Sequence, residues 1–517
     1  MDDRIIPKPL LAQPSGGRFT VSSNTVIFVD DRSYESAQHL VEMLAPALGV
    51  KLHILSSAPE LNYIALKIDP LFRGLGDEGY LLQITPSCVD LVAQTRGGLF
   101  WGLQTLRQLL PTRIFSRSQV GGVAWDIPCG TIEDRPRFRW RGMMLDCSRH
   151  FMPIEFIYQW IELLAIHKMN VFHWHLTDDQ GWRIEIKKYP KLTNIGGWRK
   201  ETLIGHALSK TKQTCDGKPH GGFYTQDQIR SVVKYAAARS INVVPEIEMP
   251  GHSQAAIAAY PHLGNIGEPI EVWTSWGVNA NILNVEESTI QFYQDVLTEV
   301  MELFPSQFIH VGGDEAIKDQ WKASPRAQAR MAELGLRDEH ELQSWFIRRM
   351  DKFLTSHGRT LVGWDEILEG GLAPGAVVMS WRGEEGGIAA ATSGHDVVMA
   401  PQQRVYFDRY QSENNEKEPL AIGGFTPIEP VYQYEPVPAE LDGKFAAHVQ
   451  GAQAQLWTEY VPDPAHALYM TYPRACAFAE VVWSGRQGRD FPEFLPRLKL
   501  HLQRLKLLGA NYRPLDS

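Results

Sequence analysis

The sequence predicts a (β/α)8 TIM barrel preceded by a small α+β domain, and three observations support this fold class. At 517 residues, the chain is too long for one ordinary domain and long enough for a large barrel with a companion. After Arg139, short apolar runs alternate with helical patterns. Each apolar run is followed by polar, acidic or aromatic residues, as at the carboxyl ends of barrel strands. A doubly wound open sheet is the alternative.

Residues 1–133 form the predicted α+β domain. Its first 17 residues are rich in Pro and Gly and predict a lead-in without regular structure. Residues 126–138 are polar and contain two prolines, which predicts a linker into a second domain at 134–517. Between them lie two helical patterns, at 36–48 and 99–110. The β-like runs of this domain are 19–29, 52–57, 63–68 and 79–94.

Eight strands are expected in the barrel, with helical patterns such as 154–168 and 228–240 between most of them. A last helix places four leucines, at 498, 502, 505 and 508, on one face and stops at Gly509. We expect it to pack on the barrel or on the small domain. The predicted barrel strands are 140–148, 170–178, 241–249, 308–314, 360–366, 376–383, 396–401 and 452–459.

Composition restricts the class of protein. Hydrophobic residues make up 44% and charged residues 21%, which is typical of a globular protein. The net charge is −9 and no long Lys/Arg run occurs, which argues against a nucleic-acid partner. The five cysteines are scattered, which argues against a disulfide framework or a zinc knuckle. We expect a monomer or homodimer.

The amino-terminal residues carry no apolar core of a signal peptide, and no run is long and apolar enough to span a membrane. The chain as printed is therefore expected to be cytoplasmic. Secretion stays open, because a chain from which a leader had been removed would look the same.

Two adjacent acids follow the fourth predicted barrel strand. Phe308 to Glu315 reads FIHVGGDE, an apolar half followed by a Gly-Gly turn that ends in Asp314 and Glu315. Acids are costly to bury unless they are paired or functional. They also favour the first turn of a helix, so a helix start is the alternative interpretation.

The ends of the other strands indicate a sugar-binding pocket. Aromatic rings can stack on a pyranose ring, and charged groups can pair with its hydroxyls. A carboxylic acid with a raised pKa could then protonate a leaving oxygen. The aromatic candidates are Trp364, Trp381, Tyr406 and Trp457, and the charged candidates are Arg149, Asp178, Asp408 and Glu459.

His173 and His175 form an HxH pair on one strand and so face the same side. With Asp178, Asp179 and His252 they could hold a divalent metal, as in metal-dependent barrel hydrolases. We favour interior histidines held by hydrogen bonds, and next a role in supporting the catalytic acids. A metal would give the aromatic rim no function.

Five motifs, in order and spacing, resemble glycoside hydrolase family 20, the β-N-acetylhexosaminidases. LDCSRHF at 145–151 and the small domain before the barrel are also similar to that family, so the resemblance covers essentially the whole chain. The resemblance implies no cofactor and no metal. The motifs are HWHLTDDQGWR (173–183), PEIEMPGH (245–252), HVGGDE (310–315), GWDE (363–366) and QLWTE (455–459).

The resemblance also implies residue roles. Glu315 would be the general acid/base, Asp314 would hold the substrate's 2-acetamido group, and Asp178 with His252 would form a relay that tunes Glu315. Substrate would be bound by Arg149, Trp364, Trp381, Tyr406, Asp408, Trp457 and Glu459, with Tyr406 donating to the acetamide oxygen. One departure is Glu248, where the family more often has Asp.

The expected function is that of an exo-acting retaining glycosidase. It would remove terminal β-linked N-acetylglucosamine or N-acetylgalactosamine by substrate-assisted catalysis through an oxazolinium intermediate, the exception that this family makes to the two-carboxylate rule. Lacto-N-biosidase-type release of a disaccharide is the alternative. A metal-dependent hydrolase and a non-catalytic sugar-binding protein are the less favoured candidates.

Overall fold

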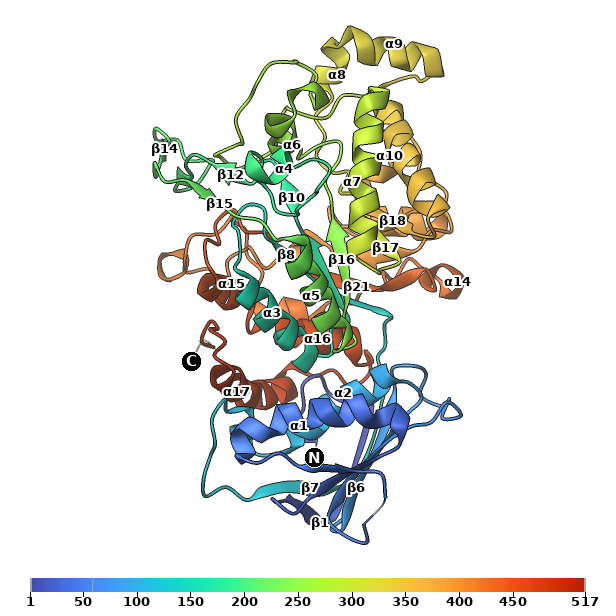
Figure 1. The fold of residues 1–517 in the computed structure, drawn as a ribbon, viewed down its shortest axis with the longest axis vertical. Helices are drawn as coiled ribbons and strands as arrows, with labels where there is room; N and C mark the ends of the chain where they lie inside the picture. Colours follow the sequence, from blue (N-terminus) through green and yellow to red (C-terminus); the bar gives the residue numbers. More distant parts are fainter. Residues whose placement is uncertain (1, 58, 516–517) are drawn as a thin grey trace.

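The computed structural model describes residues 2–57 and 59–515 and confirms the predicted fold class. Figure 1 shows a sheet with two helices in the lower part and a barrel wrapped by helices above it. The helices α1 (Tyr34–Leu48) and α2 (Arg96–Leu109) lie between the sheet and the barrel. In the described residues, all five cysteines are free thiols, and no helix is both long and apolar enough to cross a membrane.

The amino-terminal sheet has seven strands in the order β1-β7-β5-β6-β4-β2-β3. Thr95 caps the helix that crosses it, because its side chain accepts hydrogen bonds from the backbone amides of Gly97 and Gly98. The leucines of this helix, α2, are buried at positions 99, 103 and 106, and so is its carboxyl-terminal cap, Leu110. The strands are β1 (Leu11–Val21), β2 (Val26–Val29), β3 (His53–Leu55), β4 (Tyr63–Ile68), β5 (Tyr80–Ile84), β6 (Cys88–Ala93) and β7 (Trp125–Asp134).

Two predictions for this domain were wrong. The expected lead-in contributes to β1, and most of the expected linker is β7, which pairs with both β1 and β5. The physical reason is alternation: Ile127, Cys129 and Ile132 are buried while polar neighbours point away. Proline content concealed that pattern.

The barrel closes through parallel pairing of β8 with both β9 and β21, which excludes the open-sheet alternative. All eight predicted strands form. Apolar side chains such as Met144, Val244 and Val362 are buried in one cluster within it. The strands are β8 (Trp140–Asp146), β9 (Val171–His175), β16 (Asn242–Glu246), β17 (Phe308–His310), β18 (Thr360–Trp364), β19 (Val377–Ser380), β20 (Val397–Met399) and β21 (Val449–Leu456).

Helices follow most of the barrel strands, but the 3-10 helix η5 (Asp365–Leu368) takes that place after β18. The longer helices of the barrel are α3 (Ile154–Ile166), α5 (Gln226–Ala237), α7 (Glu287–Leu303), α9 (Pro325–Leu334), α10 (Glu339–Ser356), α11 (Glu385–Thr392), α15 (Pro464–Thr471) and α16 (Arg474–Trp483). The short ones are α4 (Lys191–Asn194), α6 (Gln254–Ala259), η4 (Pro261–Leu263), α8 (Asp319–Ala323), α12 (Gln402–Val405), η6 (Asn415–Lys417), α13 (Ile428–Gln433) and α14 (Gly443–Ala446).

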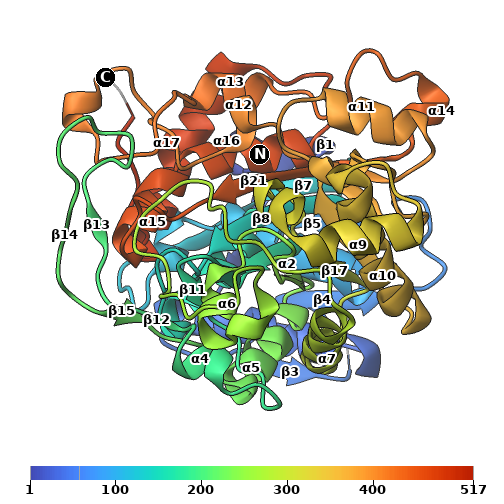
Figure 2. The ribbon, with the colours of Figure 1, turned by 90° about the horizontal axis from the view of Figure 1, so that it is seen from above.

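Three short antiparallel strand pairs lie in the segment between β9 and α5. Figure 2, seen from above, shows β13 and β14 standing out at the periphery of the barrel. The pairs are β10 (Thr177–Asp178) with β11 (Gly181–Trp182), β12 (Trp198–Arg199) with β15 (His220–Gly221), and β13 (Leu203–Ile204) with β14 (Thr214–Cys215).

The last helix, α17 (Phe491–Leu507), packs against the amino-terminal residues. Arg497 donates a hydrogen bond of 3.0 Å to the carbonyl oxygen of Ile5, and Arg504 donates one of 2.6 Å to that of Arg4. The helix also contacts η1 (Asp2–Arg4) and η3 (Thr112–Phe115). The predicted helix and its stop at Gly509, which has φ +72°, are confirmed.

A buried ion pair connects the sheet to the barrel. Lys168 Nζ lies 2.8 Å from Asp134 Oδ2 and donates to the Tyr80 hydroxyl at 2.9 Å. Both charged side chains are fully buried. Asp134 also accepts from the Trp483 indole, so several donors satisfy its carboxylate.

Candidate active site

A cavity of about 520 Å³ opens at the carboxyl ends of the barrel strands, where barrel enzymes carry their active sites. Every predicted site residue except Asp178 lines it. Asp178 lies behind the wall and contacts two lining residues, Arg149 and His252. The structure therefore brings the whole predicted set together.

The two adjacent acids sit on an unusual stretch of backbone just after β17. Gly312 and Gly313 have φ of +68° and +92°, and Glu315 itself has φ +47°. Left-handed backbone is strained for a residue with a side chain and is often found at functional sites. The next helix, α8, begins only at Asp319, so the helix-start interpretation was wrong.

His252 lies between these acids and Asp178. Its Nε2 atom is 3.3 Å from Glu315 Oε2 and 3.6 Å from Asp314 Oδ2, and its Nδ1 atom is 3.1 Å from Asp178 Oδ1. Burial lowers the pKa of His252, but the charges of Asp178 and Asp314 outweigh burial and raise that pKa well above its ordinary value. Its Nδ1 atom also lies 3.3 Å from Asp179 Oδ2, so the imidazolium connects four carboxyl groups.

The surroundings shift the pKa values of the two adjacent carboxyls in opposite directions. Burial raises the pKa of Asp314 to about 7, against the opposing charge of His252. Burial also raises the pKa of Glu315, but the hydrogen bond and charge of His252 outweigh it and lower that pKa below its ordinary value. In the ligand-free protein Asp314 therefore binds a proton more readily than Glu315 does, which is the reverse of the raised pKa expected for the catalytic acid.

Arg149 is held rigidly at one end of the cavity. Its Nη2 atom is 2.9 Å from Asp178 Oδ2, its Nη1 atom is 3.2 Å from Asp146 Oδ2, and its Nε donates to Gln180 Oε1 at 3.0 Å. Burial raises the pKa of Asp178, but Arg149 and His252 outweigh burial and hold it below its ordinary value. The charged network therefore holds the guanidinium group of Arg149 in place beside the cavity.

Four aromatic rings form the predicted wall. Trp381 stacks with Tyr406 at 6.1 Å between ring centroids, and Trp364 lies 5.8 Å from Trp457. Two indoles are oriented by acids: Trp364 donates to Glu246 and Trp381 donates to Glu366. Such ring faces suit the apolar faces of a pyranose.

Asp408 and Glu459 present acids to the same cavity. Asp408 is 4% exposed, and its buried Oδ1 atom has no hydrogen-bond partner among the described residues. Burial, with the charge of Glu459, raises the pKa of Asp408 to about 7. Buried polar atoms normally have a partner, so Asp408 is suited to bind a ligand hydroxyl.

The HxH pair lies beneath the cavity, around Glu246. His173 Nε2 lies 3.0 Å from Glu246 Oε2, and His310 Nδ1 lies 2.8 Å from Glu246 Oε1. His175 contacts Glu246 through Nδ1 and Asp178 through Nε2, at 3.0 Å for the second contact. The histidines thus have protein partners, which fits the interpretation that we favoured and extends the carboxylate network inward.

Sequence reasoning did not assign a role to several residues that shape the cavity. Asp146 accepts from the backbone amides of Ser148 and Arg149 as well as from the Arg149 side chain, so it orients that arginine. Its place at the end of a strand in LDCSRH was the available signal. Trp276 and the stacked pair of His206 and Tyr460 line the outer cavity. They come from loops without a periodic pattern.

Glu248, the noted departure, is buried beneath the acids. Its two carboxyl oxygens have no hydrogen-bond partner among the described residues. Burial, and next the charge of Asp314, raise its pKa well above the ordinary value. Glu248 therefore keeps its proton to a higher pH than an ordinary glutamic acid does.

A closed (β/α)8 barrel with paired acids and an aromatic-walled cavity at its carboxyl end has the features of the barrel glycosidases. The chain belongs to glycosyl hydrolase family 20: the profile of the family's catalytic domain matches residues 138–486, and that of its domain 2 matches residues 2–135.

Curated relatives are similar over most of the chain. A beta-hexosaminidase of Porphyromonas gingivalis is 44% identical over 98% of this chain, and a beta-N-acetylhexosaminidase of Cellulomonas fimi is 32% identical over 97%. The match spans 94% of the Cellulomonas protein but only 64% of the Porphyromonas protein.

Solved structures agree with this assignment. The family 20 beta-N-acetylhexosaminidase of Streptomyces coelicolor superposes with a TM-score of 0.87 at 32% identity, covering 100% of this chain and 98% of the other. The exo beta-N-acetylglucosaminidase of Vibrio harveyi, in complex with N-acetylglucosamine, superposes with a TM-score of 0.86 at 35% identity, covering 99% and 79%.

Proposed function

We propose that this protein is an exo-acting, retaining β-N-acetylhexosaminidase that uses the substrate's own acetamide as nucleophile. The observation that carries the proposal is the neighbouring pair Asp314 and Glu315, bridged by His252 inside an aromatic-walled cavity. Ordinary retaining glycosidases need two carboxyls that flank the scissile bond, and this family is a recognised exception. Adjacent residues suit one acid for the acetamide and one for the proton.

In the first step the acetamide oxygen attacks C1 and the bond from C1 to the leaving oxygen breaks. Glu315 gives its proton to the leaving oxygen, while Asp314 accepts a hydrogen bond from the acetamide N–H and balances the positive charge of the oxazolinium. In the second step water attacks C1, Glu315 takes the water's proton, and the ring opens. Two inversions give retention, and the internal nucleophile gains from proximity.

Substrate binding would favour transfer of the proton from Asp314 to Glu315, the general acid. An acetamide N–H that donates to Asp314 favours the ionised carboxylate and so lowers the pKa of Asp314. The sugar would also exclude water from Glu315, whose side chain is 34% exposed, and desolvation raises the pKa of that acid. The general acid would thus acquire its proton only when substrate is present.

The polar end of the cavity favours removal of a single terminal sugar. Arg149 and Glu459 lie within 3.9 Å of each other and line the cavity together with Asp408. These groups can bind the outer hydroxyls of one non-reducing sugar, which favours release of a single sugar over release of a disaccharide.

The decisive experiment compares aryl β-N-acetylglucosaminide, aryl β-N-acetylgalactosaminide and aryl β-glucoside. We expect turnover of at least one N-acetyl substrate and none of the glucoside, because glucose lacks the acetamide nucleophile. Equal rates on the glucoside would contradict the substrate-assisted mechanism. Product analysis on a tetrasaccharide would show monosaccharide release, whereas a disaccharide product would favour the lacto-N-biosidase alternative.

A further inference from the structure

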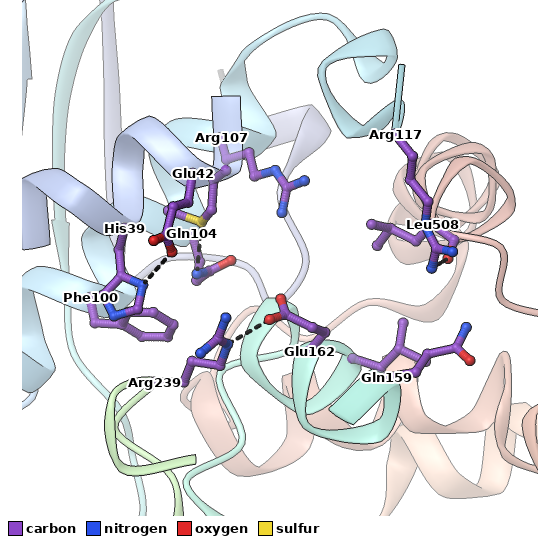
Figure 3. Close-up of a pocket in the computed structure, with 12 residues that line it drawn as sticks. His39, Glu42, Phe100, Gln104, Arg107, Arg117, Gln159, Glu162, Arg239 and Leu508 are labelled. Atoms are coloured by element: carbon purple, nitrogen blue, oxygen red, sulfur yellow. Dashed lines mark hydrogen bonds and ion pairs between the residues drawn. The ribbon is translucent and has the colours of Figure 1, made fainter. Parts of the chain in front are cut away.

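A second cavity, of about 220 Å³, lies where the amino-terminal domain meets the barrel (Figure 3). Helices α1, α2 and α3 contribute to its walls, together with single residues that follow α5, η3 and α17. It shares no lining residue with the candidate active site. The walls thus come from both domains.

Positive charge exceeds negative charge around this cavity. The lining residues include three arginines, Arg107, Arg117 and Arg239, and two glutamates, Glu42 and Glu162. Glu42 lies at the solvent edge, with a side chain that is 70% exposed. The remaining titratable group, His39, is neutral at pH 7, because burial and the nearby Arg239 lower its pKa.

Arg107 is the unusual member of this set. Its guanidinium group forms no hydrogen bond or ion pair with any residue that the structure describes, and its Nε atom is buried without a partner. It packs over the ring of Phe115 at 4.2 Å. Burial lowers its pKa to about 10, so it stays charged at neutral pH. Arg107 as a whole is half-buried, and its buried Nε donor lacks an acceptor, which indicates a place for an anion beside this guanidinium group.

The other two arginines are fixed in position. Arg239 donates to Glu162 at 2.5 Å and packs over Tyr235, while Arg117 donates to the carbonyl oxygen of Leu508. Figure 3 shows the side chains of Arg107, Arg239 and Glu162 directed toward the same space. The single Glu162 carboxylate is thus shared by more positive charge than it can neutralise.

We propose that this cavity binds a small oxyanion, a phosphate group or a small polycarboxylate, with Arg107 as its main ligand. Guanidinium groups bind planar and tetrahedral oxyanions through two parallel N–H donors. The bound anion would connect helix α2 of the first domain with α3 of the barrel. This site is independent of the proposed glycosidase activity.

The test measures thermal unfolding and isothermal titration of the full chain with inorganic phosphate and, separately, with citrate, at constant ionic strength. We expect a saturable rise in Tm and a binding isotherm for at least one of the two probes. Binding of phosphate alone or citrate alone supports the proposal and tells which class of oxyanion the site takes. No saturable response to either probe would overturn it.

Three variants assign the effect to the cavity. Arg107→Gln should weaken binding about tenfold or more, whereas Arg113→Gln, at an exposed arginine outside the cavity, should leave it unchanged. Glu162→Gln removes the competing charge, keeps an acceptor for Arg239 and should tighten binding. Equal binding by the Arg107 and Arg113 variants, or weaker binding by the Glu162 variant, would overturn the proposal.

The rate of hydrolysis of an aryl N-acetylhexosaminide distinguishes a failure of the proposed oxyanion site from a failure of the proposed glycosidase activity. Arg107→Gln should retain the wild-type rate, since Arg107 contacts none of the catalytic groups. A wild-type rate together with lost anion binding supports an independent site. If Arg107→Gln proves unstable, the opposite change expected for Glu162→Gln still decides the matter.

Discussion

At the scale of single residues, Asp314 and Glu315 are neighbours in one cavity, yet their pKa values shift in opposite directions. Burial outweighs the charge of His252 at Asp314 and raises that pKa, whereas the hydrogen bond and charge of His252 outweigh burial at Glu315 and lower that pKa. Three predictions follow from this asymmetry.

Glu315→Gln should lose about 10²–10⁴-fold in kcat/KM on a substrate with a poor leaving group, because no acid protonates the leaving oxygen. On an activated aryl substrate, whose leaving group needs little protonation, the loss should be smaller. Steady-state kinetics on a chitobiose-type disaccharide and on a nitrophenyl glycoside provide the comparison. An equal loss on both would remove Glu315 from the role of acid.

Asp314→Asn should lower kcat about 10²-fold or more, since the amide cannot balance the charge of the oxazolinium. The same variant should keep its melting temperature, because the carboxyl that it replaces has a buried oxygen without a protein partner. Kinetics and thermal unfolding of the same preparation test both statements. Unchanged turnover would show that Asp314 does not hold the acetamide.

The pH profile of kcat/KM should fall on its alkaline side near pH 7. That profile reports the free enzyme, in which the pair must carry one shared proton, and the pKa of Asp314 is about 7. Above this pH both acids are ionised and no proton remains for the leaving oxygen. Measurements from about pH 4 to about pH 9 with one aryl substrate suffice, and an alkaline limb that stays flat would contradict the shared proton.

The sequence predicted which residues meet in the cavity but not how their protons are distributed. Residue type and strand order placed the acids and tryptophans at one end of a barrel. The direction of each pKa shift depends on the balance between burial and the contact with His252, and burial prevails at Asp314 whereas His252 prevails at Glu315. Neither burial nor such a contact can be read from a sequence.

At the scale of elements, the turn after β17 carries the catalytic pair on strained backbone. Gly312→Ala should be harmful in two ways: alanine at φ +68° costs about 1–2 kcal/mol, and its Cβ would lie 1.7 Å from Glu248 Oε2. We therefore expect a lower melting temperature and a loss of kcat.

Gly394→Ala is the matched control for this change. Gly394 has φ +85°, but an added Cβ would meet no atom within 4 Å. Gly394→Ala should lower the melting temperature through the strained backbone alone, and its kcat should equal that of the wild type. If both variants behaved alike in kinetics, the close approach of Glu248 to the turn would have no part in positioning the acids.

Element prediction succeeded where burial gave a simple pattern. Most barrel strands contain a short run of apolar residues, as in β19 and β20, and all eight strands were predicted. β1 and β7 were missed because prolines and polar residues interrupt an alternation that only pairing with neighbouring strands reveals.

At the scale of the whole molecule, the buried pair of Lys168 and Asp134 should stabilise the junction between sheet and barrel. Lys168→Met leaves a buried carboxylate without its cation, which typically costs about 3–5 kcal/mol. Arg230→Met removes one partner of an exposed pair with Asp227 and should cost less than about 1 kcal/mol. Urea unfolding followed by tryptophan fluorescence tests the difference, and equal midpoints would contradict it.

The hydrogen bonds that join α17 to Arg4 and Ile5 have a consequence for synthesis on the ribosome. Arg497 and Arg504 are translated after every barrel strand, yet they hold the carbonyl groups of Ile5 and Arg4. Arg4 and Ile5 can therefore dock on α17 only after the barrel has been synthesised. This contact is thus a late event of folding, and a truncation before Arg497 would remove both hydrogen bonds at once.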